Sequence, residues 1–347
     1  MKAWRVVRHG RPTEALELLG VPEPSPGPGE VRVRVAATAC NYNEVDGCYG
    51  RYRTVDPALP YTLGMEAVGI VDAAGEGAHA WLGRRVIATG VGATGAHAEL
   101  ALAQQDMVFD CPGSLSDIEA AAFYFPFHVA WVSLIERGRL VEGEALLVHA
   151  GAGGVGSAAI QLGVARGARV IATAGSEEKL EFCRKLGADL AIDYRSDEGF
   201  AGAVLDATGG RGVDVACDLV GGDVTAQTMG CMAYGGRLMM TGFSGGIGAE
   251  DESGLLPRPV LLGNFSLSGV LMTYGDPEKF AGTPINVVPR ETGERIQAML
   301  VDLLEAGQIR PVVGRSVPHE RLPEELERME RRETMGRTVL DWKGVTA

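Results

Sequence analysis

A glycine-rich turn between an apolar run and a helical pattern constrains this chain most. The run 146–148 leads into Gly151-Ala152-Gly153-Gly154-Val155-Gly156, and a helical pattern starts at Ser157. In a strand–turn–helix of this kind, the first glycine allows a tight turn and the second lets a pyrophosphate approach the backbone. Gly156 lets helix and strand pack closely, and the helix N-terminus faces the anion. This order favours a dinucleotide site over a small-residue turn in an α/β protein.

The end of the second strand-like run, 169–174, indicates which dinucleotide binds. NAD sites usually carry an acidic residue there, about 20 residues beyond the glycines, to hold the ribose 2′-hydroxyl. Here the run ends at Gly175 and Ser176, which are small and can donate hydrogen bonds, and Lys179 adds a positive charge. These residues suit a 2′-phosphate and favour NADPH. Glu177 and Glu178 are interpreted as first-turn helix residues, where carboxylates suit the helix dipole. The alternative is that one of them binds the 2′-hydroxyl.

Composition excludes several classes of partner. A chain of 347 residues predicts two domains, and a net charge of −13 argues against nucleic acid or an anionic membrane surface. The six cysteines form no Cys-x-x-Cys pair, which favours reduced thiols and a cytoplasmic location. No apolar signal core follows Met1. The apolar run 120–135 contains Pro126 and is interpreted as a buried helix, because it is short for a bilayer span.

The pattern of the chain changes near residue 115. Before it, short strand-like runs alternate with turns, which predicts a compact β-barrel. These runs are 3–8, 31–37, 68–73, 85–88 and 97–101. After it, apolar runs alternate with helical patterns, which predicts a parallel sheet covered by helices. Those runs are 145–149, 169–174, 190–193, 214–218, 236–241 and 267–270.

The last part of the chain is expected to return to the first domain. It contains helical patterns at 292–306 and 320–332 and a final strand at 337–342. We therefore predict an α/β protein with a barrel domain in 1–125, a doubly wound parallel-sheet domain in 126–275, and a return to the barrel domain in 276–347. The glycine-rich, acidic stretch 245–257 is expected to be a loop.

Motifs in order along the chain resemble the medium-chain dehydrogenase/reductase superfamily, in its zinc-independent quinone oxidoreductase (zeta-crystallin-like) branch. They are Asn43-Glu44-Val45-Asp46, Leu63-Gly64-Met65-Glu66-Ala67-Val68-Gly69, the glycine turn, Ile192-Asp193-Tyr194-Arg195, Gly235-Gly236-Arg237-Leu238, Gly242-Phe243-Ser244-Gly245-Gly246 and Gly307-Gln308-Ile309-Arg310-Pro311-Val312. The resemblance implies a GroES-like barrel, a Rossmann domain, NADPH as cofactor and a homodimer.

The resemblance also bears on metal binding. Zinc enzymes of the superfamily hold catalytic zinc through a Cys, the His of a Gly-His-Glu motif and a later Cys. This chain has Asn43 at the first position and Met65 at the second, and Cys111 is the only cysteine in the region of the structural-zinc lobe. Asn and Met cannot replace thiolate and imidazole at tetrahedral zinc. We expect no metal, which favours reduction of an electrophilic quinone or enone over alcohol oxidation.

Candidate catalytic residues follow the strand 31–37. Asn43 and Asp46 are expected on a loop that lines the cleft between the domains, and the resemblance directs Asn43 at the nicotinamide and substrate region. Alternatively, the Asn43 amide caps the next helical turn and Asp46 braces the loop. Tyr49 and Tyr52 could donate a proton or hydrogen bond to a carbonyl oxygen, and Tyr52 matches the family's tyrosine better by order along the chain.

The resemblance adds further residues to the predicted cofactor site. It adds Tyr194 and Arg332 to Gly175, Ser176 and Lys179 at the 2′-phosphate, where a guanidinium can make bidentate contacts. Alternatively, Arg331 and Arg332 simply solvate a helix end. It also implies that cofactor contacts come from the glycine turn (Gly151, Gly153, Gly154, Val155, Gly156) and from Gly242, Phe243 and Ser244.

Three functions remain open from the sequence. The leading hypothesis is an NADPH-dependent, metal-free quinone reductase. The alternatives are an NADPH-dependent reductase of enone or enoyl-thioester double bonds and a non-catalytic NADPH-binding protein. The run 264–272 is predicted to be the edge strand of the Rossmann sheet, where pairing with a second copy would form a homodimer.

Overall fold

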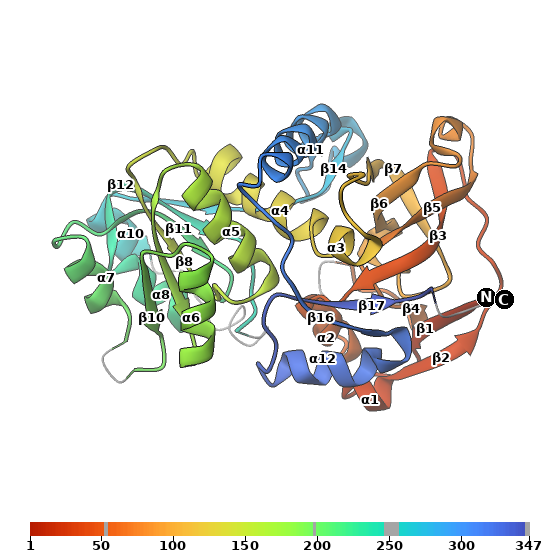
Figure 1. Ribbon diagram of the computed structural model, residues 1–347, viewed down its shortest axis with the longest axis horizontal. Coiled ribbons are helices and arrows are strands. Elements are labelled where there is room, and N and C mark those ends of the chain that lie inside the picture. The colour runs from red at the N-terminus through yellow and green to blue at the C-terminus, as the bar shows by residue number, and fades with distance from the viewer. Residues whose placement is uncertain (52–54, 197–198, 246–256, 344–347) are drawn as a thin grey trace. The chain divides into compact units, whose positions relative to one another are not determined.

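The protein divides into two compact units. A computed structural model describes all residues except 52–54, 197–198, 246–256 and 344–347. The first unit, here called the barrel unit, contains 1–125, 273–301 and 311–347, and the second, the nucleotide unit, contains 126–272 and 302–310 (Figure 1). Tyr52 and nearly all of the expected loop 245–257 lie outside the described residues.

The barrel unit is built on a ring of four antiparallel strands. Strand β3 pairs with β5 and also with β7, and β6 joins β5 to β7, so the ring closes. In β3 the valines at 31, 33 and 35 point into the core, while Arg32 and Arg34 face outward and pair with Asp72 at 2.9 and 2.8 Å. The ring strands are β3 (Glu30–Ala39), β5 (Glu66–Ala74), β6 (Arg85–Gly90) and β7 (Leu100–Asp110).

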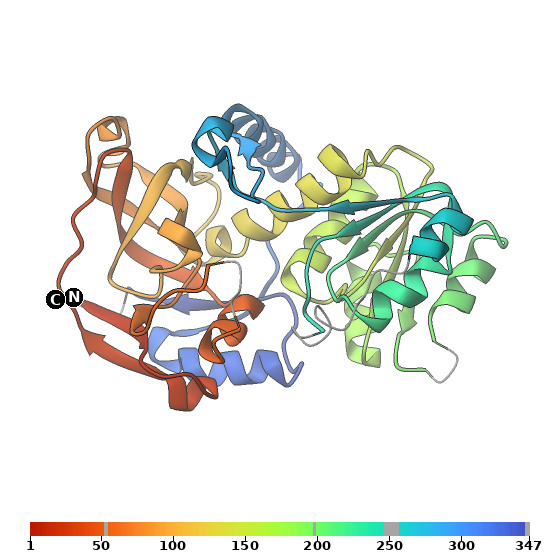
Figure 2. The same ribbon diagram turned by 180° about the vertical axis from the view of Figure 1, so that it is seen from behind.

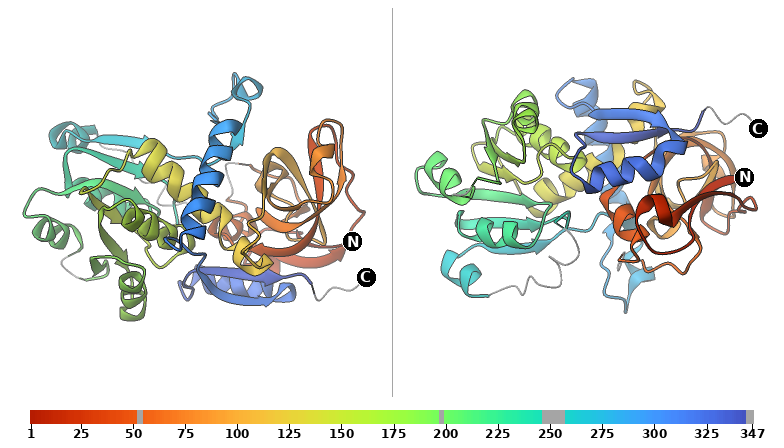
Figure 3. Two further views of the ribbon diagram at one scale, coloured as in Figure 1. Left: turned by 45° about the horizontal axis from the view of Figure 1, so that its top comes forward. Right: turned by 90° about the horizontal axis from the view of Figure 1, so that it is seen from below.

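The C-terminal part of the chain completes the barrel unit. Strand β17 (Arg337–Asp341) pairs antiparallel with β3 and parallel with β16 (Val313–Pro318). Helix α12 (Leu322–Glu330) packs against α1 (Pro12–Ala15) and α2 (Tyr42–Cys48) (Figure 3). The remaining strands of the unit are β1 (Lys2–Val6), β2 (Leu16–Gly20), β4 (Tyr61–Thr62), β14 (Tyr274–Gly275) and β15 (Val288–Pro289).

The nucleotide unit is a six-stranded parallel sheet in the order β10-β9-β8-β11-β12-β13, with helices on both faces (Figure 2). The order reverses between β8 and β11, which makes the fold doubly wound. Its strands are β8 (Ala145–Val148), β9 (Arg169–Ala174), β10 (Leu190–Asp193), β11 (Val213–Asp218), β12 (Met232–Met240) and β13 (Ser266–Gly269). Its helices are α5 (Gly154–Ala165), α6 (Glu177–Lys185), α7 (Ala201–Ala207), α8 (Asp223–Met229) and α10 (Pro257–Gly263). The predicted α/β fold class, with a barrel and a doubly wound sheet, is confirmed.

Two helical segments differ in their bounds from the sequence-based prediction. The apolar run starts with α3 (Asp117–Ala121), continues through α4 (Tyr124–Trp131) and ends in a π-helical stretch, Val132–Arg137. The helix Asp117–Arg137 is therefore longer than predicted, and by length and composition it could cross a membrane. However, 78% of its apolar window is buried inside the protein, as in the core helix of a globular fold. Helix α11 (Arg290–Glu305) begins two residues before its predicted start.

The predicted strand 97–101 is largely wrong. Strand β7 begins at Leu100 and runs to Asp110. Ahead of it, Ala98 makes an isolated bridge to Ala3, and His97 turns its ring toward Thr38 and Glu44. Residue 97 lies outside any strand, although its backbone accepts the Trp4 N–H and donates to Leu63, both at 2.9 Å, and its ring adds the side-chain bonds.

Candidate cofactor and catalytic site

The glycine turn joins β8 to α5 at the carboxyl edge of the parallel sheet. Backbone bonds tie it to both neighbouring strands, because His149 N–H donates to Cys217 (3.1 Å) and Gly151 N–H donates to Thr173 (2.9 Å). Ala150 has a φ of 49°, in the left-handed region, and its carbonyl accepts the Gly153 N–H at 2.9 Å. The chain thus reverses within a few residues, and Gly153 becomes the N-cap of α5.

The three motif glycines meet different surroundings. A Cβ on Gly156 would lie 2.2 Å from the Ala150 carbonyl oxygen, and one on Gly151 would lie 2.9 Å from the Cys183 Sγ. Both glycines therefore let backbone and helix pack in direct contact. A Cβ on Gly153 would meet only the Ala150 oxygen, at 3.3 Å. The space beside Gly153 and the N-terminal N–H groups of the twelve-residue α5, which include those of Gly154 and Val155, fit a pyrophosphate.

Four of the predicted phosphate residues come together after β9 and β10. Ser176 is the N-cap of α6, and its hydroxyl accepts the Lys179 backbone N–H at 3.3 Å. A Cβ on Gly175 would lie 3.0 Å from the Tyr194 ring, so the tyrosine packs directly against this glycine. Tyr194 is still 41% exposed. The hydroxyl of Ser176, the Tyr194 ring and the first turn of α6, which carries Lys179, thus belong to one surface.

The two glutamates after Ser176 occupy the first turn of α6, as interpreted from the sequence. The Glu177 carboxylate pairs with Arg184 at 2.8 Å. Glu177 therefore has a cationic partner on its own helix, which weakens its case as a ligand of the ribose 2′-hydroxyl. For Glu178, the alternative that its carboxylate binds the ribose 2′-hydroxyl stays open.

The loops after β11 and β12 run side by side beyond the sheet. The N–H groups of Thr241 and Gly242 donate to the Asp218 carbonyl at 2.8 and 3.1 Å, and Ser244 N–H donates to Leu219 at 3.0 Å. A Cβ on Gly221 would lie 3.1 Å from the Phe243 ring. The predicted residues Gly242, Phe243 and Ser244 thus lie at the carboxyl edge of the sheet, where doubly wound folds bind ligands.

Asn43 and Asp46 lie on helix α2, not on a loop, because β3 extends to Ala39 and the helix begins three residues later. The N-cap is Asn41, whose backbone N–H donates to Glu44 at 3.0 Å in a capping box. From the sequence, Asn43 could cap the next helical turn, but the residue that caps α2 is Asn41. The Asn-x-x-Glu spacing of 41–44 is a capping-box signal that the sequence reasoning missed.

Asp46 and Tyr49 have partners within the barrel unit. The buried Asp46 carboxylate lies 3.8 Å from the Nε of Arg51, whose guanidinium lies over the Tyr49 ring at 4.3 Å. Burial and a hydrogen bond to the Glu330 carboxylate raise the pKa of the Tyr49 phenol. These contacts support a bracing role for Asp46 and leave Tyr49 a weaker proton donor than expected. Tyr52, the favoured tyrosine, lies outside the described residues.

A buried polar network holds the start of α2. Glu44 accepts the N–H of Met65 at 3.0 Å and contacts His97 Nε2 at 3.1 Å, while Thr38 Oγ1 contacts His97 Nδ1 at 2.8 Å. The Trp342 indole, which can only donate, donates to Thr38 at 3.0 Å. Trp342, Thr38, His97 and Glu44 thus form one continuous hydrogen-bonded chain, in which His97 Nε2 donates because an ionised carboxylate only accepts.

This network predicts a pH-dependent contribution to stability. Burial acts to raise the pKa of Glu44, but His97 and the backbone N–H donors outweigh it and lower the pKa. The contribution of Glu44 is therefore present above the carboxyl pKa of the unfolded chain and is lost as pH falls through the folded pKa. We expect Glu44→Gln to lower the free energy of unfolding by about 2 kcal/mol at pH 7. In urea unfolding curves, the difference from wild type should shrink as pH falls below the ordinary glutamate pKa of about 4.3. A difference that does not vary with pH would contradict this assignment.

A second buried network lies beside the first. Arg337 of β17 donates to Asn41 Oδ1 at 2.9 Å and to the Glu66 carboxylate, and Asn41 Nδ2 donates to Glu66 Oε1 at 3.3 Å. Burial raises the pKa of Glu66, and the Arg337 charge opposes the shift. Sequence reasoning did not find Glu66 or Arg337 as partners, since 271 positions separate them.

Arg332 belongs to the barrel unit, while the other predicted cofactor residues belong to the nucleotide unit. It follows the end of α12 with a φ of 62°, and its guanidinium lies over the Tyr42 ring at 4.9 Å. Its neighbour Arg331 pairs instead with Glu333 at 2.8 Å and Glu327 at 3.6 Å. The helix-end interpretation therefore describes Arg331, and for Arg332 both interpretations stay open.

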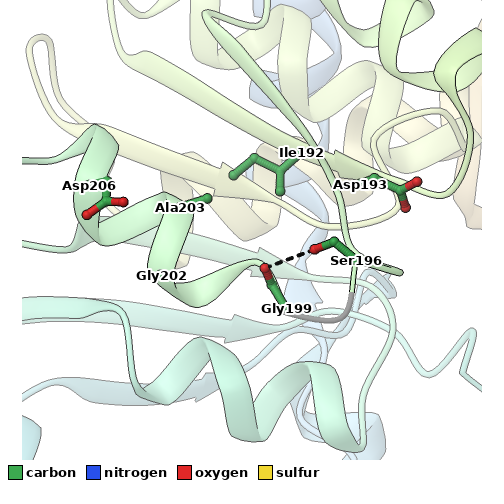
Figure 4. Close-up of a pocket in the computed structure, with 7 residues that line it drawn as sticks. All are labelled: Ile192, Asp193, Ser196, Gly199, Gly202, Ala203 and Asp206. Atoms are coloured by element: carbon green, nitrogen blue, oxygen red, sulfur yellow. Dashed lines mark hydrogen bonds between the residues drawn. The ribbon is translucent and has the colours of Figure 1, made fainter.

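A cavity of about 360 Å³ lies between the end of β10 and α7 in the nucleotide unit (Figure 4). None of the predicted site residues lines it, and its carboxylates Asp193 and Asp206 would repel an anionic cofactor. We do not place the cofactor there. Within the described residues, no three His, Cys, Asp or Glu side chains are grouped closely enough to hold a metal ion. Metal independence stays a prediction.

Comparison with known families matches both halves of the chain. Residues 27–113 match the alcohol dehydrogenase GroES-like domain, and residues 154–283 match the domain described as zinc-binding dehydrogenase. The quinone oxidoreductase of Sus scrofa is 30% identical over 327 residues, which cover 92% of this chain and 91% of that protein.

Two further matches are a structure solved with NADPH and a short segment of a much longer protein. A mycobacterial protein solved in complex with NADPH superposes with a TM-score of 0.84 at 28% identity, covering 98% of this chain and 99% of that one. A phenolphthiocerol/phthiocerol polyketide synthase protein of Mycobacterium tuberculosis is 39% identical over 207 residues. That match covers 59% of this chain but only 9% of the synthase protein.

Proposed function

Because the chain belongs to the medium-chain dehydrogenase/reductase superfamily, in its quinone oxidoreductase-like branch, we propose that it reduces quinones with NADPH. The glycine turn is the observation that carries the cofactor half of this proposal. Its two packed glycines and the open space at Gly153 provide the cradle that a dinucleotide pyrophosphate requires. The NADPH complex of a structural relative supports the same cofactor.

The residues of this chain bind and orient the reactants. NADPH, when bound, supplies the hydride. We assign the pyrophosphate to the glycine turn, and the 2′-phosphate to Ser176, Lys179 and Tyr194. Asn43, in the first turn of α2, is assigned to orient the carbonyl of the substrate. A quinone needs no protein acid, because water can protonate the hydroquinone, and this agrees with the engaged hydroxyl of Tyr49.

An NADPH oxidation assay tests the proposed function. The purified protein, dialysed against a strong chelator, is given a panel of small quinones, an enone and an enoyl thioester. The proposal predicts turnover of quinones with unchanged rates after chelation. Activity that disappears with the metal, or turnover of the enoyl thioester alone, would refute it.

A second candidate is reduction of an enoyl-thioester double bond. It is favoured by the matching segment of the polyketide synthase, which is more similar to this chain, at 39% identity, than the full-length quinone oxidoreductase is. The same site residues would hold NADPH, and only the acceptor would differ. The thioester arm of the assay above distinguishes the two.

The surface formed by Gly175, Ser176 and Lys179 predicts a preference for NADPH over NADH. A charge-assisted phosphate contact contributes about 1.5–3 kcal/mol, so Lys179→Ala should weaken NADPH binding roughly ten-fold or more and leave NADH nearly unchanged. Fluorescence titration measures both affinities. Lys185→Ala, which removes an exposed lysine at the other end of α6, is the matched control and should change neither. Equal losses for both nucleotides in Lys179→Ala would exclude the assignment.

The homodimer prediction rests on β13, the strand at one edge of the parallel sheet. Among the described residues, strand β13 has a partner only on its β12 side, so its other edge can pair with a second copy. Leu267→Pro should remove a ladder donor and weaken the dimer, while Leu267→Ala, which keeps the N–H, should weaken it less. Light scattering at micromolar concentration measures both. A monomeric wild type, or a dimer that both variants leave intact, would contradict this interface.

A further inference from the structure

His149 is a buried polar residue just before the glycine turn, and the proposed function gives it no role. It follows β8, and its ring nitrogens lie 2.9 Å from Thr173 Oγ1 on β9 and 2.8 Å from Thr228 Oγ1 on α8. The Phe200 ring packs edge-on against the imidazole, with 4.7 Å between the ring centroids. The imidazole therefore joins the end of β8 to a neighbouring strand and to a helix of the same unit.

The hydrogen bonds of the His149 ring have a definite direction. Burial lowers the pKa of His149 to about 4, so at neutral pH the ring is neutral, with one nitrogen that donates and one that accepts. The single hydroxyl proton of Thr228 is donated to the Val224 carbonyl at 2.6 Å. Thr228 can therefore only accept from Nε2, and Nδ1 accepts the hydroxyl proton of Thr173. Both ring nitrogens thus have a partner of the required kind.

The same strand also holds the backbone of the glycine turn. Thr173 accepts the Gly151 N–H through its carbonyl and contacts His149 through its hydroxyl, so one residue of β9 fixes the chain at two points. A Cβ on Gly151 would lie 2.9 Å from Cys183 of α6 and 3.2 Å from Ile160 of α5. The imidazole reaches α8 instead. The turn thus packs on two helices, and His149 anchors it to a third.

We propose that His149 is a positioning residue that holds the glycine turn in the conformation that receives the pyrophosphate of NADPH. This inference rests on the NADPH part of the proposed function. The glycines have no side chains with which to brace the turn, so a buried side chain beside it must fix its shape before the nucleotide arrives. The pyrophosphate is common to NADPH and NADH. Loss of His149 should therefore weaken both nucleotides, whereas loss of Lys179 should weaken NADPH alone.

Fluorescence titration with both nucleotides tests this role. His149→Leu removes both ring hydrogen bonds and leaves the Thr173 hydroxyl without its acceptor, so we expect roughly ten-fold weaker binding of NADPH and of NADH. His149→Gln keeps an N–H donor for Thr228 and should stay within about three-fold of wild type. Thr228→Val should also weaken both nucleotides, and the double variant should lose no more than His149→Leu alone, because both changes act through one hydrogen-bonded group. Additive losses, or a loss confined to NADPH, would overturn the proposal.

Amide hydrogen exchange of the full chain without nucleotide separates a local role from a loss of overall stability. We expect His149→Leu to speed exchange at least about ten-fold in 150–156 and to leave β12, the strand beyond β11, within about two-fold of wild type. Equal acceleration in both segments would show that His149 serves general stability only. A wild type that binds neither nucleotide would refute the proposed function, while the exchange pattern would still decide whether His149 holds the turn.

A matched control removes a hydroxyl at the opposite edge of the same sheet. Thr208 Oγ1 accepts the Gly212 N–H at 2.9 Å, just before β11 begins at Val213. Thr208→Val should lower the melting temperature and leave both nucleotide affinities and the exchange of 150–156 unchanged. If it reproduces the losses of His149→Leu, the effect is not specific to the turn and the proposal fails. Absence of quinone turnover in a wild type that binds NADPH would refute the proposed function and leave the His149 inference standing.

Discussion

Replacing Gly156 with alanine is expected to abolish measurable NADPH binding and to destabilise the nucleotide unit. The new Cβ would lie 2.2 Å from the Ala150 carbonyl oxygen and 2.8 Å from its carbon, both backbone atoms of the turn. Helix α5 or the turn must move to relieve this overlap, at a cost of about 3 kcal/mol. We expect NADPH affinity to fall at least roughly 100-fold, because the phosphate cradle is the part that moves. Fluorescence titration and thermal unfolding measure the two effects.

Two other glycine substitutions serve as controls for this prediction. Gly153→Ala places its Cβ beside only one oxygen, at 3.3 Å, so it should keep stability but weaken NADPH binding where the pyrophosphate approaches. Gly202→Ala, on α7, meets nothing within 4 Å and should change neither property. A Gly156→Ala protein with a native melting temperature and native affinity would show that the turn is placed wrongly.

Replacing Arg337 with methionine is expected to lower the free energy of unfolding by about 3–5 kcal/mol. The Arg337 and Glu66 side chains are 7% and 1% exposed, so removal of the cation leaves a buried carboxylate without its charged partner. The Asn41 amide and the Phe125 backbone still donate to it, but both are neutral. Because burial already raises the pKa of Glu66, the variant should recover stability as pH falls and that carboxyl takes up a proton. Urea unfolding at several pH values measures this.

A double variant makes the Arg337 prediction specific. Glu66→Gln with Arg337→Met removes both charges and should regain much of the lost stability, because no unpaired buried charge remains in this pair. Arg8→Met is a useful control, since its guanidinium pairs with Glu17 at 2.9 Å where both side chains are exposed, and such a pair should contribute little. If the double variant is no more stable than Arg337→Met alone, charge pairing is not what Arg337 provides.

Five of the six strands of the parallel sheet could be predicted from sequence to within one residue, whereas β12 begins at Met232, four residues before its predicted start. For example, β9 and β10 have the predicted bounds, 169–174 and 190–193. Buried parallel strands are continuous apolar runs, and helical patterns and glycine turns separate them. This periodic signal is local, so a single sequence carries it.

The barrel unit was harder because its signals are not local. His97 has the sequence pattern of a strand, yet its partners Thr38 and Glu44 are 59 and 53 positions away. Helix α2 is short and depends on the Asn41 cap and on packing against α12, whose sequence comes near the end of the chain. The hydrogen bond of Tyr49 to Glu330 has the same long-range origin. The candidate site residues of this unit therefore stay predictions, whereas the glycine turn could be recognised from its local order.

The order of β17 in its sheet has a consequence for synthesis. This strand lies between β16 and β3, so the sheet of the barrel unit stays incomplete until residues 337–341 leave the ribosome. Most of the nucleotide unit, 126–272, is by then already available as one continuous piece. The second unit to be encoded can thus become compact first, and the end of β3, residues 37–39, must wait with an unpaired edge for a partner about 300 residues away. A nascent chain stalled before Arg337 would expose that edge, so premature termination shortly before this strand should yield aggregates rather than a shortened enzyme.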